Sequence, residues 1–263
     1  MCPVGAGLLG GAMCCHCLLL EGEDGLILVD SGLGEEDVSN PKRLGRLFRA
    51  ATRPRLRIAE TALRQVADLG FRVADVRHIV PTHLDLDHAG GLADFPAATV
   101  HAFGPELRAA KEPTFRERMR YLPAQLSSVA NWALVEPGGD EWFGFDSVRA
   151  LPGGRDDVLL IPLPGHSRGH CGVAVWTRDG WLLHCGDAYF HHAEVAPEGG
   201  KAPLALRMFE SLVNADRPAR LANRERLREL AQSHGDEVRL ICSHDAADFA
   251  AFHSCGRAPQ RHS

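Results

Sequence analysis

The chain has 263 residues, of which 45% are hydrophobic and 24% are charged, a composition that supports one large hydrophobic core or two smaller ones. The formal net charge of −5 and the scattered basic residues argue against a nucleic-acid surface. No apolar stretch approaches the roughly 20 residues that a membrane span needs. The N-terminal segment lacks the basic residues of a signal peptide. We therefore expect a cytoplasmic protein that binds neither nucleic acid nor membrane.

The eight cysteines are few for this length, and several lie in apolar runs that are typical of strands. This favours reduced, mostly buried thiols over disulfides. Cys14 and Cys17 form a Cys-x-x-Cys pair, but a zinc ribbon needs a second such pair, which the chain lacks. We expect this segment to be a core strand.

The first half of the chain alternates strand-like and helix-like segments, as layered α/β proteins do. Apolar runs at 13–20 and 25–29, joined by a turn composition, predict a hairpin. The spacing at 58–69 predicts a helix that ends at Gly70. Residues 76–80 and 98–102 are expected to be strands, and 104–121 a helix interrupted at Pro113.

The second half is richer in strand signals. Strands are expected at 148–151, 158–162, 173–177, 181–185 and 238–242. One or two helices are expected over 204–234, with a break at Pro218. Residues 111–145 concentrate the scarce aromatic side chains, which predicts either a helix on the core or a cap over a pocket. We expect one domain over residues 1–263.

An unusual cluster of ionisable side chains follows the strand predicted at 76–80. His83, Asp85, Asp87 and His88 lie within six residues, ahead of Gly90 and Gly91. Ionisable groups are buried only when they are paired or bind a metal. The pattern therefore indicates half of a two-metal site.

Three later strands also end in residues of the metal-binding type. The strand at 158–162 is followed by His166, the strand at 181–185 by Asp187, and the strand at 238–242 by His244. The ends of strands are where an α/β sheet presents its binding residues.

In this order, the motifs resemble the metallo-β-lactamase fold superfamily, which has an HxHxDH loop followed by a glycine-histidine pair, an aspartate and a histidine. Asp30, Ser31 and Gly32 also match the first motif of that family. The resemblance covers roughly residues 12–250, and five motifs in order are specific. It implies a four-layer αββα sandwich, with two mixed sheets between layers of helices and a metal site at one edge.

The resemblance also implies seven ligands for two divalent ions that share a bridging water or hydroxide. These are, for the first ion, His83, Asp85 and His166; for the second ion, Asp87, His88 and His244; and, bridging both, Asp187. The implied enzyme is a metal-dependent hydrolase in which a metal-bound hydroxide attacks a carbonyl. Asp187 would position this nucleophile and help to move its proton.

Asp85 departs from the family pattern, which has a histidine at this position. A carboxylate makes the first site harder, so iron or manganese become alternatives to zinc, which we place first. Asp85 also motivates an alternative of another class, an iron-dependent redox enzyme similar to a sulfur dioxygenase. A third alternative is a weakened site that binds a single ion.

Further residues are candidates by position. Tyr189, two residues after Asp187, either donates a hydrogen bond to the substrate oxygen or leaving group, as a tyrosine near this place does in lactonases of the family, or is a surface or core residue. His170 and Asp30 are expected to contact metal ligands rather than the ion. The expected partner is a small-molecule substrate, with a lactone or ester first and a thioester or phosphodiester second. A homodimer is left open.

Overall fold

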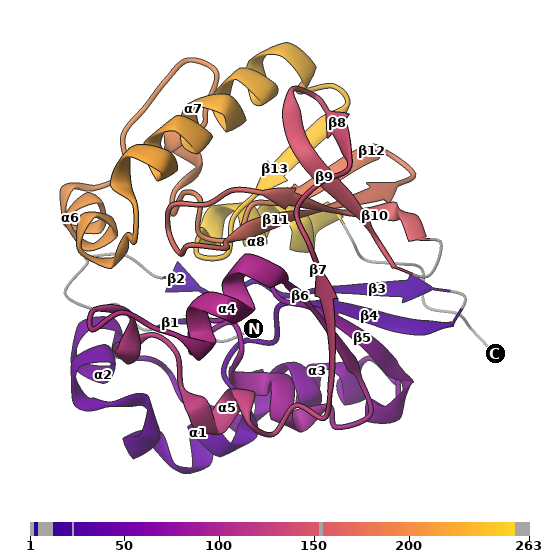
Figure 1. Ribbon diagram of the computed structural model, residues 1–263, viewed down its shortest axis with the longest axis vertical. Coiled ribbons are helices and arrows are strands. Elements are labelled where there is room, and N and C mark those ends of the chain that lie inside the picture. Colours follow the sequence, from indigo (N-terminus) through magenta and orange to yellow (C-terminus); the bar gives the residue numbers. More distant parts are fainter. Residues whose placement is uncertain (1–2, 5–12, 23, 153–154, 256–263) are drawn as a thin grey trace.

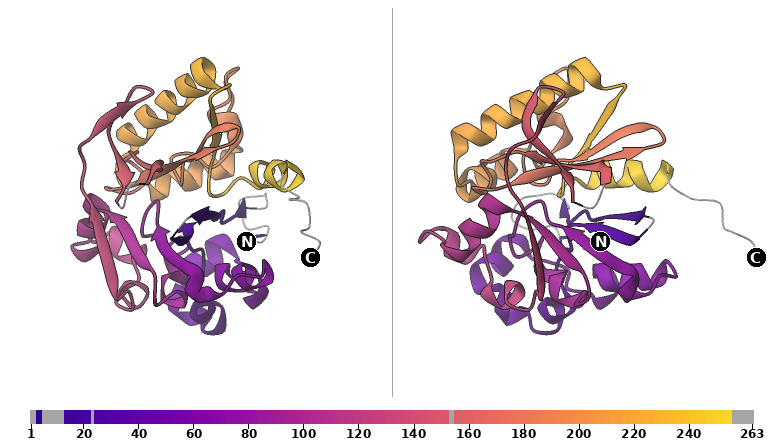
Figure 2. Two further views of the ribbon diagram at one scale, coloured as in Figure 1. Left: turned by 90° about the vertical axis from the view of Figure 1, so that its right-hand side faces the viewer. Right: turned by 45° about the vertical axis from the view of Figure 1, so that its right-hand side comes forward.

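The computed structural model describes residues 3–4, 13–22, 24–152 and 155–255. Within them, two β-sheets pack face to face between helices (Figures 1 and 2). The first sheet has its strands in chain order, and all neighbours are parallel except the hairpin of β3 and β4. These strands are β3 (Leu18–Gly22), β4 (Gly25–Val29), β5 (Val76–Val80), β6 (Thr99–Phe103) and β7 (Asn131–Val135).

The second sheet has the order β13-β12-β11-β10-β9-β8 and is antiparallel except for β12 and β13, which are parallel. Its strands are β8 (Asp140–Trp142), β9 (Phe145–Leu151), β10 (Arg155–Pro162), β11 (Cys171–Thr177), β12 (Gly180–His184) and β13 (Val238–Ile241). A short separate pair joins β1 (Pro3–Val4) and β2 (Met13–Cys14).

Helices cover the outer faces of both sheets. The α-helices are α1 (Glu35–Ser39), α2 (Arg46–Thr52), α3 (Ala62–Asp68), α4 (Gly104–Lys111), α5 (Pro123–Leu126), α6 (Leu204–Val213), α7 (Arg217–His234) and α8 (Ala246–Cys255). Short 3-10 turns are η1 (Pro41–Leu44), η2 (Ile58–Glu60), η3 (Val73–Asp75), η4 (Gly90–Asp94), η5 (Glu117–Met119) and η6 (His192–Glu194). In Figure 1, α1, α3 and α5 lie below the first sheet and α7 lies above the second.

Side-chain alternation along the strands builds the layers, because successive residues of a strand point to opposite faces. On β4, Ile27 and Val29 face the second sheet, where they meet Val158 and Leu160 of β10. Their neighbours on β4 pack instead against the helices of the first sheet. Leu227 of α7 belongs to a third cluster on the outer face of the second sheet. The prediction of an αββα sandwich is confirmed.

Most predicted strands are present with shifted ends, but some expectations were wrong. The run predicted at 13–20 divides into β2 and β3, which pair with different partners. The segment 204–234 forms two helices, as one alternative expected, but the break lies at 214–216 and Pro218 lies in the first turn of α7, where its missing N–H costs nothing. Residues 111–145 are not one helix. They contain η5, α5, and the edge strands β7 and β8, and so carry the chain from one sheet to the other.

The remaining expectations concern thiols and membranes. Six cysteines form no disulfide, and all but one of them are buried: Cys14, Cys15, Cys17, Cys171, Cys185 and Cys242. Over the part of the chain that the structure describes, no helix combines the length and apolar character needed to cross a bilayer.

A histidine pair links the neighbouring strands β5 and β6 within the sandwich. His78 Nδ1 lies 2.9 Å from His101 Nε2, and His101 is buried. Burial, together with the nearby His78, lowers the pKa of His101 to about 4. The imidazole is therefore neutral in the folded protein at pH values where it is partly protonated in the unfolded chain.

This pair predicts a pH dependence of stability. Between the unfolded pKa of about 6.5 and the folded value, the unfolded state binds more protons, so stability falls as the pH falls. The His101 contribution to the free energy of unfolding should decrease by roughly 2 kcal/mol from pH 7 to pH 5. Chemical denaturation of the wild type and His101→Gln at both pH values measures it. An equal pH dependence in the two proteins would contradict the prediction.

Candidate metal centre

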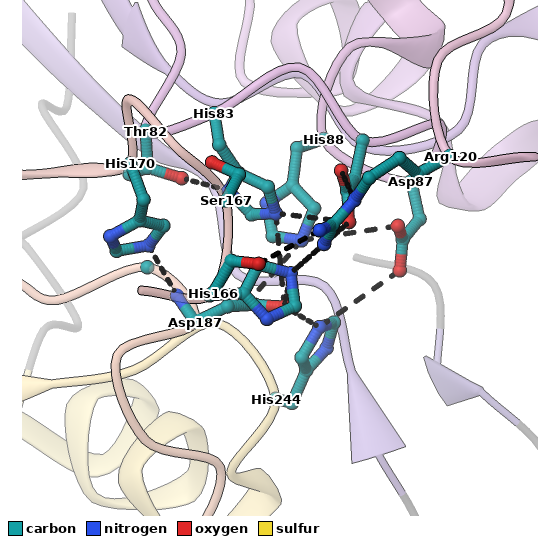
Figure 3. Close-up of polar contacts among 12 residues, drawn as sticks. Thr82, His83, Asp87, His88, Arg120, His166, Ser167, His170, Asp187 and His244 are labelled. Atoms are coloured by element: carbon teal, nitrogen blue, oxygen red, sulfur yellow. Dashed lines mark hydrogen bonds and ion pairs between the residues drawn. The ribbon is translucent and has the colours of Figure 1, made fainter. Parts of the chain in front are cut away.

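The predicted ligands come together at one edge of the sandwich, at the ends of strands from both sheets (Figure 3). Residues 81–91, the motif loop, follow β5, and Asp30 follows the adjacent parallel strand β4. Asp187 and His244 follow β12 and β13, which are also parallel. Parallel strands end at the same edge, so strand pairing alone brings these side chains together. His166 arrives from residues 163–170, the His166 loop, which connects β10 to β11.

Asp187 lies at the centre of the group, and four buried imidazoles face its carboxylate. Its Oδ2 is 3.1 Å from His244 Nε2, 3.4 Å from His166 Nε2 and 3.8 Å from His83 Nε2. Its Oδ1 is 3.5 Å from His88 Nε2. This is the central position that the sequence predicted for a bridging residue.

Asp87 completes one side of the group. Its two oxygens lie 4.0 Å from His88 Nε2 and 3.9 Å from His244 Nε2. Ligand atoms around a tetrahedral zinc ion lie about 3.3 Å from one another, because each is about 2 Å from the ion. The Asp187 distances to His244 and His88, 3.1 and 3.5 Å, are close to this spacing, and the two Asp87 distances are somewhat longer. Cys15 Sγ is also near, 4.0 Å from Asp87 Oδ2.

Whether a cation fits the site can be judged from buried polar atoms that have no hydrogen-bond partner. Among the side chains that the structure describes, buried atoms without a hydrogen-bond partner include His83 Nε2, His88 Nε2 and Asp187 Oδ1. These three residues offer ligand atoms within 4.8 Å of one another. Leaving a buried polar atom unsatisfied costs about 1–3 kcal/mol, and a shared cation would satisfy all three. The donor set on this side fits a divalent ion.

Neighbouring groups orient the imidazoles. Asp30 Oδ2 accepts from His88 Nδ1 (2.9 Å), and Asp30 Oδ1 accepts from the Thr82 N–H (2.7 Å). The first bond directs Nε2 of His88 toward Asp187. His170 Nδ1 donates to the Leu163 carbonyl oxygen (3.0 Å), while its Nε2 accepts from the Asp187 N–H (2.9 Å). As predicted, Asp30 and His170 hold candidate ligands.

Gly186 makes the approach of His170 to Asp187 feasible. Its φ is +54°, a region that favours glycine, and a Cβ atom there would collide with the His170 ring and with Thr82.

The buried carboxylate of Glu106, on α4, joins the two ligand loops. Its Oε1 accepts from the Leu84 N–H (3.0 Å) in the motif loop. Its Oε2 accepts from Ser167 Oγ (2.6 Å) and the Gly169 N–H (3.0 Å) in the His166 loop. One side chain thus fixes the distance between ligands that come from different sheets.

Mutual electrostatics set the charges of the group. Although burial opposes it, the imidazoles of His244, His88 and His166 hold the pKa of Asp187 well below its usual range. At His88, burial lowers the pKa, but the nearby carboxylates of Asp187, Asp30 and Asp87 outweigh it and raise the pKa to about 10. At His166, burial and the Arg120 guanidinium lower the pKa to about 3. The Asp187 carboxylate therefore stays ionised at the centre of the group, which suits a cation.

Asp85 differs from the other candidates, because a guanidinium already binds it. Arg120 Nε donates to Asp85 Oδ1 and Arg120 Nη2 to Asp85 Oδ2, each at 2.7 Å. The same Nη2 lies 2.7 Å from His166 Nε2, and Nη1 donates to the His166 carbonyl oxygen (2.8 Å). His83, Asp85 and His166 do converge as predicted, but Arg120 contacts two of them, Asp85 and His166. Figure 3 shows Arg120 beside His166.

Tyr189 does not join the group, and of the two alternatives given for it the structure favours the core residue over the substrate contact. Its side chain is buried in the outer core of the second sheet, with Trp142 and Leu227. Burial raises the pKa of its hydroxyl well above the usual value. The next residue, Phe190, faces the ligands instead, with its ring 4.9 Å from His244 and 5.8 Å from His166.

Three residues of the site escaped the sequence analysis. Glu106 lies on α4 and Arg120 directly after η5, in segments without a motif, and their charges are ordinary for a solvated surface. Cys15 belongs to the cysteine-rich segment that we predicted to be a core strand. The sequence did indicate several buried carboxylates, which need a cation nearby. Nothing in it says which arginine supplies that positive charge.

The layered fold and the clustered histidines and aspartates, which could hold a metal ion, are those of the metallo-hydrolase class to which the chain is similar. Residues 11–233 match the family model described as the metallo-beta-lactamase superfamily, and the chain belongs to this family. The resemblance stated from the motifs is thereby confirmed.

Curated relatives extend this match. Proteins of Mycobacterium bovis and Mycobacterium tuberculosis, both named "Probable metallo-hydrolase", are 43% identical over 237 residues, which is 90% of this chain and 76% of theirs. An N-acyl homoserine lactonase of Bacillus cereus is 30% identical over 202 residues, 74% of each chain.

Solved structures share the fold. The Bacillus thuringiensis lactonase AiiA, in a mutant with N-decanoyl-L-homoserine bound, superposes with a TM-score of 0.69 at 23% identity, over 92% of this chain and 85% of that one. The dizinc quorum-quenching lactonase AidC has a TM-score of 0.57 at 18% identity, over 89% of this chain and 73% of that one.

The Asp30–His88 contact predicts an effect on metal binding. Asp30→Asn keeps the shape and tolerates the positive φ of 56°, but weakens the bond that orients His88. Affinity for Zn²⁺ should fall by about 10–100-fold. Competition with a chromophoric chelator measures it. The control is Asp94→Asn, which alters a partly buried carboxylate at the end of η4 that accepts from the Glu35 N–H. Equal affinities in all three proteins would contradict this role of Asp30.

Proposed function

We propose that this protein hydrolyses a lactone or another carboxylic ester in a metal-dependent reaction. The observation that carries the proposal is the convergence of four buried imidazoles on the Asp187 carboxylate, with Asp87 beside two of them, His88 and His244. The residues that would hold a divalent ion are His88 and Asp187, with Asp87 and His244 on one side and His83 on the other. Zinc is our first choice, since histidine and carboxylate ligands suit it.

A divalent ion bound there supplies two things, a water whose pKa is lowered toward neutrality and a Lewis acid for the carbonyl oxygen. Asp187 serves the same reaction by orientation. Its Oδ1 has no hydrogen-bond partner in the structure and stays ionised, so it can accept a hydrogen bond from the attacking water and aim it. The His170–Asp187 backbone bond holds this carboxylate in place.

The lactone or ester is supported by the relatives named as lactonases and by exposed apolar side chains on the segment that leads to Arg120. Phe115 and Met119, on the segment that leads to Arg120, are 85% and 65% exposed. Leu212 of α6 is also exposed, and Arg116 Nη2 donates to its carbonyl oxygen (3.5 Å), which connects this segment to α6. Apolar side chains on two adjoining segments favour a substrate with an apolar acyl part.

Redox chemistry is not proposed. Its motivation was Asp85 as an iron ligand, and both oxygens of Asp85 are bound by Arg120. Thioesters and phosphodiesters stay alternative substrates for the same centre.

A substrate panel tests the proposal directly. The purified, zinc-loaded protein should hydrolyse acyl lactones or simple esters with kcat/KM at least tenfold above that for thioesters, phosphodiesters and β-lactams. Hydrolysis of every carbonyl substrate releases acid, so a pH indicator measures the rates for all of them in the same assay. Activity on none of the carbonyl compounds would refute the proposal, and a preference for phosphodiesters would move it to the second candidate.

A pair of variants tests the assigned roles. Asp187→Ala should lower kcat/KM by about 10³-fold or more, because it removes the central carboxylate of the site. Tyr189→Phe should change kcat/KM less than about threefold, because the hydroxyl lies in the core. Thermal melts establish that both variants are folded. Full activity in Asp187→Ala would refute this mechanism, and a large loss in Tyr189→Phe would restore the substrate contact given as an alternative for that residue.

A further inference from the structure

Arg120 contacts the ligands that the family pattern assigns to a first metal ion. Its guanidinium approaches the group from the chain between η5 and α5 and is largely buried, with 12% of its side chain exposed. It is the cation in contact with Asp85, to which it donates two parallel hydrogen bonds of 2.7 Å. Bidentate pairs of this kind are among the stronger polar contacts in proteins.

The contact with His166 decides whether an ion can bind there. A guanidinium has only donors, so His166 Nε2, which lies 2.7 Å from Arg120 Nη2, must be the acceptor. An imidazole nitrogen has a single lone pair in the ring plane, and this hydrogen bond uses it. The same lone pair cannot bind a metal ion at the same time. His166 Nδ1, which then carries the proton, faces no partner.

Asp85 is constrained in the same way. Each of its oxygens accepts from Arg120, and Oδ2 is also 3.1 Å from His166 Nε2. Two of the three ligands of the first ion are thus engaged by one side chain. The ligands on the other side, Asp87, His88 and His244, make no hydrogen bond to Arg120. Arg120 therefore interferes only with the ligands of the first ion.

We infer that this centre takes one divalent ion, and that the Arg120 guanidinium stands in place of the second. The inference rests on the metal-dependent function proposed above and specifies its metal content. In this arrangement Asp85 is the anchor of Arg120 rather than a metal ligand. Arg120 is a positioning residue that holds Asp85 and His166 beside the bound ion.

Metal stoichiometry tests the inference without reference to catalysis. Metal-free wild type is titrated with Zn²⁺ against a chelator, and bound metal is counted by elemental analysis after gel filtration. We expect one ion per chain in the wild type. Arg120→Met removes the charge and the donors but keeps the length, and it should bind a second ion at least tenfold more tightly than the wild type does. Arg168→Met is the matched control, because Arg168 pairs with Glu117 of η5, on the segment that carries Arg120. This variant should still bind one ion.

The wild-type titration carries the test even if Arg120→Met fails to fold. Loading with Co²⁺ adds a spectroscopic measurement, since two ions sharing a bridging ligand give a spin-coupled signal and one ion does not. Two tightly bound ions in the wild type, or one in a folded Arg120→Met, would overturn the inference and leave the proposed hydrolysis standing. One ion with no hydrolysis of any substrate would refute the function and leave the inference standing. A wild type that binds no ion would overturn both.

Discussion

The site depends on one electrostatic constraint, the burial of the Asp187 carboxylate among four imidazoles. A buried carboxylate is costly unless positive charge or hydrogen-bond donors surround it. Here the distances from its oxygens to the nearest imidazole nitrogens run from 3.1 to 3.8 Å, and the four imidazoles come from three loops that follow strands of both sheets. The same carboxylate raises the pKa of His88 and of His244. Charge at this point links the two halves of the sandwich.

Two further carboxylates make this arrangement rigid. Asp30 joins β4 to the motif loop through Thr82 and His88, and Glu106 joins the motif loop to the His166 loop. Each is almost fully buried, so its bonds are not exchanged with water. The imidazoles therefore keep their orientation without an ion, which lowers the entropy cost of binding one.

Much of this could be predicted from sequence, because the information is local. Asp87, His88, Asp187 and His244 each follow an apolar run, and strand ends in an α/β fold meet at one edge. Tyr189 shows the limit of this reasoning. A spacing of two residues from Asp187 places a side chain near the site along the chain, but the turn after Gly186 directs it into the core and leaves Phe190 facing the ligands.

Arg120 and Glu106 show a different limit. Their contacts with the site span 35 and 63 residues, and nothing near them in the chain marks them as buried. The edge strands β7 and β8 were missed for a related reason. Each pairs along one side only, so the sequence need not be apolar on both faces, and exposed Glu141 and Leu134 obscure the pattern. Long-range pairing, rather than local preference, decides these positions.

The contact with Arg120 changes the interpretation of Asp85, which replaces the histidine of the family pattern. Considered alone, a carboxylate in place of an imidazole makes a harder ligand and shifts the preference among metals. Beside Asp87 and Asp187, however, it would also bring a third negative charge into a small buried volume. Arg120 neutralises that charge with a fixed, non-titrating cation whose planar donors match the carboxylate. The exchange of a neutral imidazole for a carboxylate is therefore balanced by a guanidinium. What Asp85 determines is the number of metal ions at the centre rather than their identity.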